Sequence, residues 1–241
     1  MRASAAAVLE SISGDNVILE KVSADVSIND LLAEVTVTQK YRNPGESNIE
    51  ALYTFPMPLD GILLSFDVEI GDRKLSGTVV EKSDAERRYE DAVTDGDTAI
   101  LLEQVEPGLY SASVGNLLPG ETAVLRFRYG QFLRWNGERV RLMIPTTVAP
   151  RYGDASAAGL APHQTPEYSF DAERSFNMHV SAKGLLKNAN FSSPSHEIRV
   201  FSKARETKIN FVGNPGMDRD FVLEAFAPNC NANCALVAAD I

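Results

Sequence analysis

Residues 64–72 have the sequence Leu-Ser-Phe-Asp-Val-Glu-Ile-Gly-Asp, and this stretch decides the fold class of the 241-residue chain. Apolar residues occupy every second position from Leu64 to Ile70, which is the period of a β-strand with one buried face. The Gly-Asp pair then turns the chain into a second strand-like stretch over residues 75–80. Two such stretches joined by a short glycine-containing turn predict a β-hairpin.

The same alternation recurs along most of the chain. Residues 31–38 place Leu, Ala, Val and Val at every second position, and the Asn-Pro-Gly-Glu sequence at 43–46 ends that strand. Many short strands at a spacing of about ten residues, separated by turn residues, are typical of a sandwich. The sequence therefore predicts an all-β fold, a large antiparallel β-sandwich. The further predicted strands are residues 99–104, 109–114, 123–132, 139–144, 176–180, 198–200, 209–212 and 221–226.

One stretch has the period of a helix instead. Residues 83–86, Ser-Asp-Ala-Glu, fit a capping box, in which the serine hydroxyl and the glutamate carboxylate accept hydrogen bonds from free amides at a helix start. Apolar and aromatic positions then recur at helical spacing from Ala85 to Ala92. The Asp-Gly-Asp sequence at 95–97 ends the run. We predict one short helix over about residues 84–94.

The composition changes once along the chain, at residues 150–166, which are rich in Ala, Gly and Pro and show no periodicity. This segment is expected to be a long surface connection. We therefore predict a first domain at residues 1–152, followed at 153–241 by a linker and further strands that pack on it to complete one β-sandwich body. The apolar run at 235–241 has no stop signal, so the chain is expected to continue into another element.

The formal net charge of −10 argues against a general affinity for nucleic acid or for anionic membranes, because both need an excess of Lys and Arg at the contact surface. Lys203, Arg205 and Lys208 form a local exception, which is explained most simply as the outward face of a strand. The N-terminus lacks the apolar core of a secretory signal, and no stretch approaches the ~18 apolar residues of a transmembrane helix. A soluble protein without membrane insertion, in the cytoplasm, is expected.

The two cysteines do not make a disulfide framework. Cys230 and Cys234 flank an Asn-Ala-Asn turn, so free thiols and a small local disulfide ring are both open. They form only half of a zinc site, and the three histidines have no matching spacing.

Motifs of nucleophilic or nucleotide chemistry are missing from the sequence: there is no Gly-x-Ser-x-Gly elbow and no phosphate-binding loop. Carboxylate pairs do occur, and such pairs serve hydrolases or bind cations. One pair is Asp95 with Asp97 and the other is Asp218 with Asp220. Both lie in turns that contain glycine, where exposed carboxylates usually accept hydrogen bonds from backbone amides. We nominate no catalytic and no cofactor-binding residue and expect no cofactor. The candidate metal ligands are Asp95, Asp97, Asp218 and Asp220.

Several short motifs, in order, resemble those of the VIT domain, the vault protein inter-alpha-trypsin module. No single motif is decisive, but their order over about 140 residues makes coincidence implausible. Residues 217–223 also resemble the segment that precedes a von Willebrand factor A domain in such proteins. The motifs are Tyr-Arg-Asn-Pro at 41–44, Ile-Glu-Ala-Leu-Tyr-Thr-Phe-Pro-Met-Pro at 49–58, Ile-Gly-Asp-Arg at 70–73, Val-Glu-Lys at 80–82, Tyr-Glu-Asp-Ala at 89–92, Ala-Ile-Leu-Leu-Glu-Gln at 99–104, Ser-Val-Gly-Asn at 113–116, Pro-Gly-Glu at 119–121 and Pro-Thr-Thr-Val-Ala-Pro-Arg-Tyr at 145–152.

This resemblance implies a function as well as a fold. The family includes the heavy chains of inter-alpha-trypsin inhibitor, vault poly(ADP-ribose) polymerase and intracellular proteins that pair the module with a von Willebrand A domain. The module itself is considered non-catalytic, and metal-dependent adhesion belongs to the downstream domain, whose Asp-x-Ser-x-Ser site is absent here. The family residues themselves are expected to be structural: Gly71, Gly115 and Gly120 in turns, and Leu52, Phe55 and Tyr89 as core anchors.

Three hypotheses about function follow. The favoured one is a non-catalytic protein-interaction or scaffold module, the N-terminal part of a VIT and von Willebrand A protein, with the downstream domain as one partner and other protein partners unknown. The alternative is a metal-ion-dependent binder or hydrolase that uses the turn carboxylates. A third possibility is self-assembly through exposed edge strands, which β-modules commonly use for partner binding.

Overall fold

The structure is a computed structural model of the chain, and it describes residues 5–6, 8–11, 17–78, 80–148, 176–213, 215–216 and 219–228. These residues form a mostly β protein with one α-helix, which confirms the predicted fold class. No helix among them is long and apolar enough to cross a membrane.

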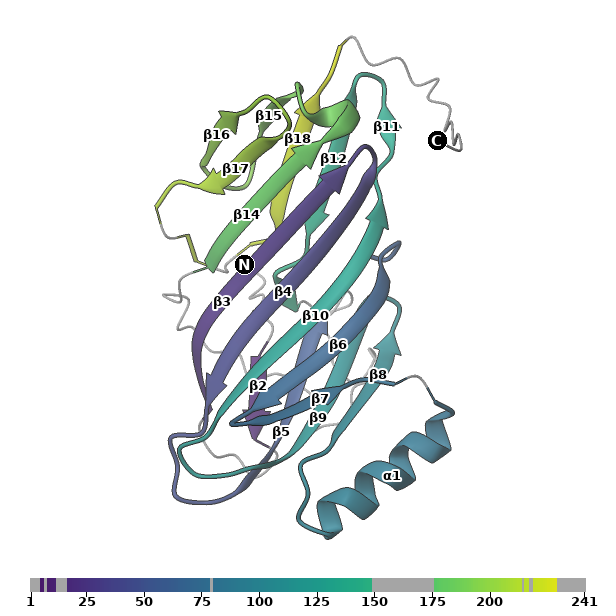
Figure 1. Cartoon of the computed structure of the whole chain (residues 1–241), viewed down its shortest axis with the longest axis vertical. Helices are drawn as coiled ribbons and strands as arrows, with labels where there is room; N and C mark the ends of the chain where they lie inside the picture. Colours follow the sequence, from purple (N-terminus) through teal and green to yellow (C-terminus); the bar gives the residue numbers. More distant parts are fainter. Residues whose placement is uncertain are drawn as a thin grey trace.

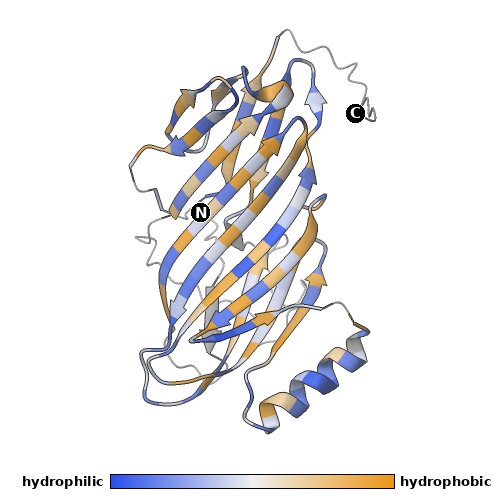
Figure 2. Cartoon of the chain, in the orientation of Figure 1, coloured by the Kyte–Doolittle hydropathy of each residue, from blue (hydrophilic) through white to orange (hydrophobic). Residues whose placement is uncertain are grey.

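The largest element is a sheet of eight strands, whose long strands cross the front of the molecule in Figure 1. Its central strands alternate buried with partly buried residues. The striped colouring of Figure 2 shows the accompanying alternation of hydrophobic and hydrophilic residues. In spatial order the strands are β16 (Ile198–Ser202), β17 (Thr207–Phe211), β14 (Phe176–Lys183), β3 (Ile18–Asn29), β4 (Leu32–Arg42), β10 (Thr122–Phe132), β6 (Ile62–Ile70) and β7 (Arg73–Ser76).

Two four-stranded sheets lie behind the large one, one toward each end of the molecule (Figure 1). The first consists of β11 (Trp135–Asn136), β12 (Arg139–Ile144), β18 (Phe221–Phe226) and β15 (Asn190–Ser192). The second consists of β2 (Val8–Ser11), β5 (Ile49–Pro56), β9 (Leu109–Leu117) and β8 (Ile100–Glu106). The remaining elements are the pair β1 (Ala5–Ala6) and β13 (Thr147–Val148), helix α1 (Lys82–Thr94) and the 3-10 turn η2 (Gly184–Leu186).

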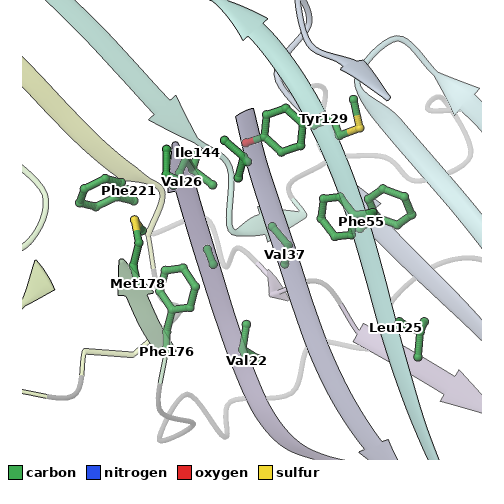
Figure 3. Close-up of a cluster of buried hydrophobic side chains, with 14 of the residues drawn as sticks. Val22, Val26, Val37, Phe55, Leu125, Tyr129, Ile144, Phe176, Met178 and Phe221 are labelled. Carbon is green, nitrogen blue, oxygen red and sulfur yellow. The ribbon is translucent and has the colours of Figure 1, made fainter. Parts of the chain in front are cut away.

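The core between the sheets is one continuous hydrophobic cluster, part of which is drawn in Figure 3. Phe55 from β5 joins the layers, because its ring lies 4.2 Å from that of Phe127 and 5.8 Å from that of Phe66, both on the large sheet. Leu52 is buried on the same strand. Burial of each such side chain stabilises the fold by roughly 1.5–3 kcal/mol. Phe55 is thus a core residue, as predicted, whereas Leu52 is buried but is not part of this cluster.

The predicted hairpin is present as β6 and β7, with Ile70 opposite Arg73. Gly71 occupies the first turn position with φ +56°, a conformation that glycine adopts without strain. Asp67 accepts a hydrogen bond from the hydroxyl of Ser76 across the two strands, at 2.7 Å. The first strand and the turn were therefore located correctly, but the second strand is Arg73–Ser76 and not the predicted residues 75–80.

The start of helix α1 differs from its prediction. The helix begins at Lys82 with Glu81 as N-cap, and no side chain caps it. The Ser83 hydroxyl instead donates to the Glu81 carboxylate at 3.3 Å. Asp84 in the first turn forms an ion pair with Arg88 at 2.6 Å, one turn further on. The predicted capping box was wrong, because the chain enters the helical conformation before Ser83.

One pair of strands in the large sheet is parallel. β14 runs beside β3 in the same direction, with Phe176 opposite Val22 and Lys183 opposite Asn29. The two strand ends are held together by Asp30, whose carboxylate accepts a hydrogen bond from the Leu185 amide at 2.9 Å. Side chains alternate with period two in parallel and antiparallel strands alike, so the sequence pattern could not reveal this pairing within a sandwich that is otherwise antiparallel.

Candidate functional site

The motif residues gather around the loops at one end of the sandwich, with Asn43 at their centre. The Asn43 side chain is fully buried. Its Nδ2 donates to the carbonyl oxygens of Leu117, at 3.0 Å, and Ser47, at 2.9 Å, while its Oδ1 accepts from the Gly45 amide. The Asn43 amide also donates to the Glu121 carbonyl at 3.0 Å. Asn43 thereby ties the loop between β4 and β5 to the loop between β9 and β10.

A second connection in the same region is the ion pair of Arg73 and Glu121. The Arg73 Nη2 lies 2.7 and 2.8 Å from the two carboxylate oxygens of Glu121. One of these oxygens also accepts from the Leu118 amide at 2.9 Å, and Arg73 Nη1 donates to the hydroxyl of Thr98. The pair therefore fixes the β6–β7 hairpin against the β9–β10 loop and against the segment after helix α1.

Helix α1 is attached to the second small sheet through Tyr89. The half-buried Tyr89 side chain donates its hydroxyl hydrogen to the Glu50 carboxylate on β5. Burial raises the pKa of Tyr89 well above its usual value of 10.0, and the hydrogen bond to Glu50 raises it further. Tyr89 was predicted to be a core anchor; it is only partly buried, and it fixes a helix to a sheet through its polar end.

Gly115 and Asn116 let the helix approach the sheet closely. A Cβ atom on Gly115 would lie 2.7 Å from Val93 Cγ2 of the helix, closer than real Cβ contacts. Asn116 has φ +57°, and its side chain donates to the Asp97 carbonyl at 2.7 Å while accepting from Asn48 at 2.7 Å. Gly115 was expected in a turn, but it lies within β9, where its missing side chain makes room for the helix. Gly71 and Gly120 do lie in turns, both with positive φ.

The predicted metal ligands Asp95 and Asp97 lie where the backbone ends helix α1. Gly96 adopts φ +83°, its amide donates to the Val93 carbonyl at 3.1 Å, and the Asp97 amide donates to the Ala92 carbonyl at 2.9 Å. This pair of bonds is the Schellman motif that ends helices. The side chains of Asp95 and Asp97 are exposed to solvent beside it.

The second predicted pair is only half described. Asp218 lies outside the described residues. Asp220 Oδ1 accepts a hydrogen bond from the Thr146 amide at 3.0 Å, and the Thr146 hydroxyl donates to the Arg219 carbonyl at 2.8 Å. In the part of the chain that the structure describes, no three His, Cys, Asp or Glu side chains come together as a metal site. Cys230 and Cys234, for which free thiols and a local disulfide were both left open, also fall outside the described residues.

The residues of this network lie in a part of the chain that matches a known protein family. Residues 19–129 match the family model of the vault protein inter-alpha-trypsin domain. The chain carries a VIT domain. The matched range contains the whole hydrogen-bonded network described above, from Asn43 through Arg73 and Tyr89 to Glu121. The resemblance found in the sequence is thereby confirmed for residues 19–129. Within this range, motif residues that include Asn43, Arg73 and Tyr89 hold the loops and the helix together.

Relatives of this VIT domain are found in larger proteins. Von Willebrand factor A domain-containing protein 5A of Rattus norvegicus is 32% identical over 163 residues, which is 66% of this chain but 20% of that protein. Protein mono-ADP-ribosyltransferase PARP4 of Mus musculus is 30% identical over 214 residues, 87% of this chain and 11% of that protein. The chain thus spans at most about a fifth of the length of these two relatives.

Solved structures are similar only at a distance. A putative nutrient binding protein from Legionella pneumophila aligns with a TM-score of 0.49 and 10% identity, covering 93% of this chain and 72% of that one. An M1 zinc metallopeptidase from Deinococcus radiodurans aligns with a TM-score of 0.43 and 9% identity, covering 88% and 42%. Similarity at this level carries no functional argument.

Outside the residues matched to the VIT domain, the structure has an open cavity of about 450 Å³ that the sequence did not indicate. Its lining includes Ser195 and His196, which are neighbours in the chain. The Ser195 hydroxyl lies 2.8 Å from His196 Nδ1 and accepts a hydrogen bond from the Val222 amide at 2.8 Å. The His196 ring packs 5.0 Å from Phe211 and 5.8 Å from Phe221. Ser195 thus holds the start of β18, and the histidine packs among aromatic rings.

Proposed function

We propose that this chain is a non-catalytic protein-interaction or scaffold module of a VIT and von Willebrand A type protein. The observation that carries the proposal is that side chains of the family motifs bond to the protein's own loops. Asn43, Arg73 and Glu121, which belong to the recognised motifs, direct their polar atoms at the protein's own loops and so build a scaffold. The curated relatives support the proposed setting, because they include von Willebrand factor A domain-containing proteins.

We extend this proposal to the domain boundaries. Residues 1–152 are the VIT part, and the strands beyond residue 153 complete the same β-body and lead toward a von Willebrand A domain. Two pairings support the single body: β14 pairs with β3 in the large sheet, and β18 pairs with β12 in the first small sheet. A VIT part cut before β14 would leave one edge of each sheet without its partner strand.

Hydrogen exchange in the full-length gene product tests the proposed scaffold role. Exchange is measured for residues 1–241 alone and within the full-length protein. A scaffold that supports a neighbouring domain will show a contiguous surface whose amides exchange more slowly in the full-length protein. A gene product without a von Willebrand A domain, or two domains with unchanged exchange and independent melting, would remove the proposal. The cytoplasmic location belongs to the same proposal and is tested by imaging a fluorescent fusion of the full-length protein.

The metal-dependent alternative needs its own experiment. Calcium, magnesium and zinc are titrated into the chain by calorimetry, and the melting temperature is measured in parallel, because a ligand that binds only the folded state raises it. The scaffold proposal expects no heat of binding and no shift. A saturable heat that disappears in an Asp95→Asn, Asp97→Asn variant or in Asp220→Asn would favour the alternative and identify which pair binds the ion.

A further inference from the structure

β16 is the terminal strand of the large sheet, at the upper left of Figure 1, and its pairing partner among the described strands is β17 alone. Two hydrogen bonds fix which of its backbone groups are used. The Val212 amide donates to the Glu197 carbonyl at 3.0 Å, and the Lys203 amide donates to the Glu206 carbonyl at 2.9 Å. Both bonds connect directly opposite residues, so they show which opposite pairs of β16 and β17 are the hydrogen-bonded pairs.

The phase determines which groups are left free. In an antiparallel pair, opposite residues alternate between hydrogen-bonded and non-hydrogen-bonded pairs. Arg199 and Phe201 lie two and four residues after Glu197, so their backbone N–H and C=O groups also bond to β17. The N–H and C=O groups of the three intervening residues therefore point away from the sheet. These residues are Ile198, Val200 and Ser202.

The other described edges differ from this one. β2 and β7 have four residues each, β15 has three, and β11 has two. β8 is longer, but its pairing is interrupted by a bulge between Gln104 and Glu106, and helix α1 packs beside it. Short, bulged or covered edges are the usual protection against unwanted strand pairing. Of these edges, β16 combines regular pairing on its inner side with an outer side that no described element covers.

The side chains of β16 are also suited to contact. Val200 is 39% exposed and Phe201 is 46% exposed, and they project from opposite faces of the strand because they are consecutive. A strand added at this edge would bring side chains beside both of them. Cross-strand neighbours of this kind supply most of the specificity in strand addition, while the backbone bonds supply affinity.

The charge of the β16 edge indicates what kind of partner strand it would bind. Arg199, Lys203 and Arg205 are exposed, and within the described parts of the chain none of these three cations has an ion-pair partner. Lys208 is paired with Glu206 at 3.3 Å. The edge is thus net basic, with these three cations against the one exposed carboxylate of Glu197, although the chain as a whole carries −10. This net positive charge favours an added strand of opposite charge over a second copy of the same edge.

We propose that β16 is a docking edge that binds an extended acidic segment of a partner protein as an added β-strand. The inference rests on the proposed interaction function and assigns it a surface and a partner chemistry. The acidic side chains of the partner lie beside Arg199 and Lys203, and its backbone bonds the outward groups of Ile198, Val200 and Ser202.

The test uses a fluorescently labelled peptide that alternates Thr with Glu, titrated against residues 1–241 and read by anisotropy. Two control peptides replace Glu with Lys or methylate every backbone amide. Only the unmethylated acidic peptide is expected to bind, and its affinity is expected to fall as salt is added, because the attraction is partly electrostatic. Equal binding of the Lys peptide or of the methylated peptide would overturn the proposal.

Variants of the protein locate the site. Val200→Pro removes an outward N–H that β17 does not use, and proline is tolerated where the N–H faces solvent at a sheet edge. We expect about ten-fold weaker binding of the acidic peptide, while the matched control Val200→Thr binds like the unaltered chain. The melting temperature of both variants is measured to show that the sheet is intact. Equal binding to Val200→Pro and Val200→Thr would refute the site.

Other occupants have recognisable signatures. Light scattering that shows dimers broken by Val200→Pro would assign the edge to a second copy of the chain and overturn the acidic partner. Binding that is unchanged in Lys203→Gln would overturn the role of charge. If no peptide binds while hydrogen exchange still shows a protected surface in the full-length protein, the docking edge fails and the scaffold function stands.

Discussion

A methyl group added at Gly115 tests whether the close approach of helix α1 is built into the fold. In Gly115→Ala the new Cβ would lie 2.7 Å from Val93 Cγ2, so the two carbons must separate by at least about 0.7 Å to reach the 3.4 Å of ordinary contact. Val93 is β-branched, and in a helix its side chain has one strongly preferred rotamer. It cannot turn away easily, so the helix itself must move.

The expected cost follows from two opposing terms. Overpacking of a well-packed contact costs about 1–3 kcal/mol. Replacing glycine by alanine restricts the unfolded chain and returns about 0.4–1 kcal/mol. We therefore expect Gly115→Ala to lower the free energy of unfolding by about 1–2 kcal/mol. Gly130→Ala is the matched control on β10, because its Cβ would lie 3.6 Å from the nearest atom, Leu64 Cδ1, and it should be neutral or slightly stabilising.

Urea denaturation of four proteins decides the matter: the unaltered chain, Gly115→Ala, Val93→Ala and the double variant. If the clash with Val93 is the cause, the double variant will be more stable than the sum of the single effects predicts, by about 1 kcal/mol. Hydrogen exchange of the α1 amides should also be faster in Gly115→Ala. Equal stability of Gly115→Ala and Gly130→Ala, with no coupling to Val93, would refute the reasoning.

Three further predictions concern the network around the loops. Asn43→Ala should cost about 2–4 kcal/mol in urea denaturation, because it leaves buried carbonyl and amide groups without partners; a cost below that of the exposed variant Asn48→Ala would contradict this. Arg73→Lys should cost about 1 kcal/mol, since a single ammonium group cannot keep the Glu121 contacts of Nη2 and also donate to the Thr98 hydroxyl as Nη1 does, and a loss in Glu121→Gln checks the contribution of the ion pair. The free energy of unfolding should fall above pH 10, because the raised pKa keeps Tyr89 protonated in the folded state, while in the unfolded chain Tyr89 ionises at its usual pKa of 10.0. Between pH 9 and pH 11 the Tyr89→Phe variant should lose less of this free energy than the unaltered chain, and the difference should be the part that comes from ionisation of the Tyr89 hydroxyl.

The sequence predicted those parts of the fold that depend on local pattern. Alternation from Leu64 to Ile70, followed by Gly-Asp, identified the β6–β7 hairpin, because strand period and turn geometry are both short-range properties. The parallel pairing of β14 with β3 joins residues far apart in the chain, and nothing in either strand encodes its partner or its direction. The fold class was therefore predictable, but the order of strands in the large sheet was not.

The motif residues of the site were predictable from the sequence, but the contacts that they make in the fold were not. The family residues were recognised in the sequence, but their roles depend on contacts across the sheets. Gly115 was assigned to a turn, because the helix atom that excludes a side chain there comes from Val93, a residue distant in sequence. Asp95 and Asp97 were interpreted correctly as the end of the helix run, since the Asp-Gly-Asp pattern is itself local. The edge groups of β16 could not be assigned without the register of its ladder.

The pairing of β14 with β3 also determines when the large sheet can be completed during biosynthesis. β3 ends at Asn29, and its parallel partner begins at Phe176, about 150 residues later. A ribosome that adds 5–20 residues per second needs roughly 7–30 s to make that interval. During this time β3 can pair with β4, but its other side has no strand to receive it. The nascent chain therefore carries an open sheet edge at β3 for seconds before β14 is available to close it.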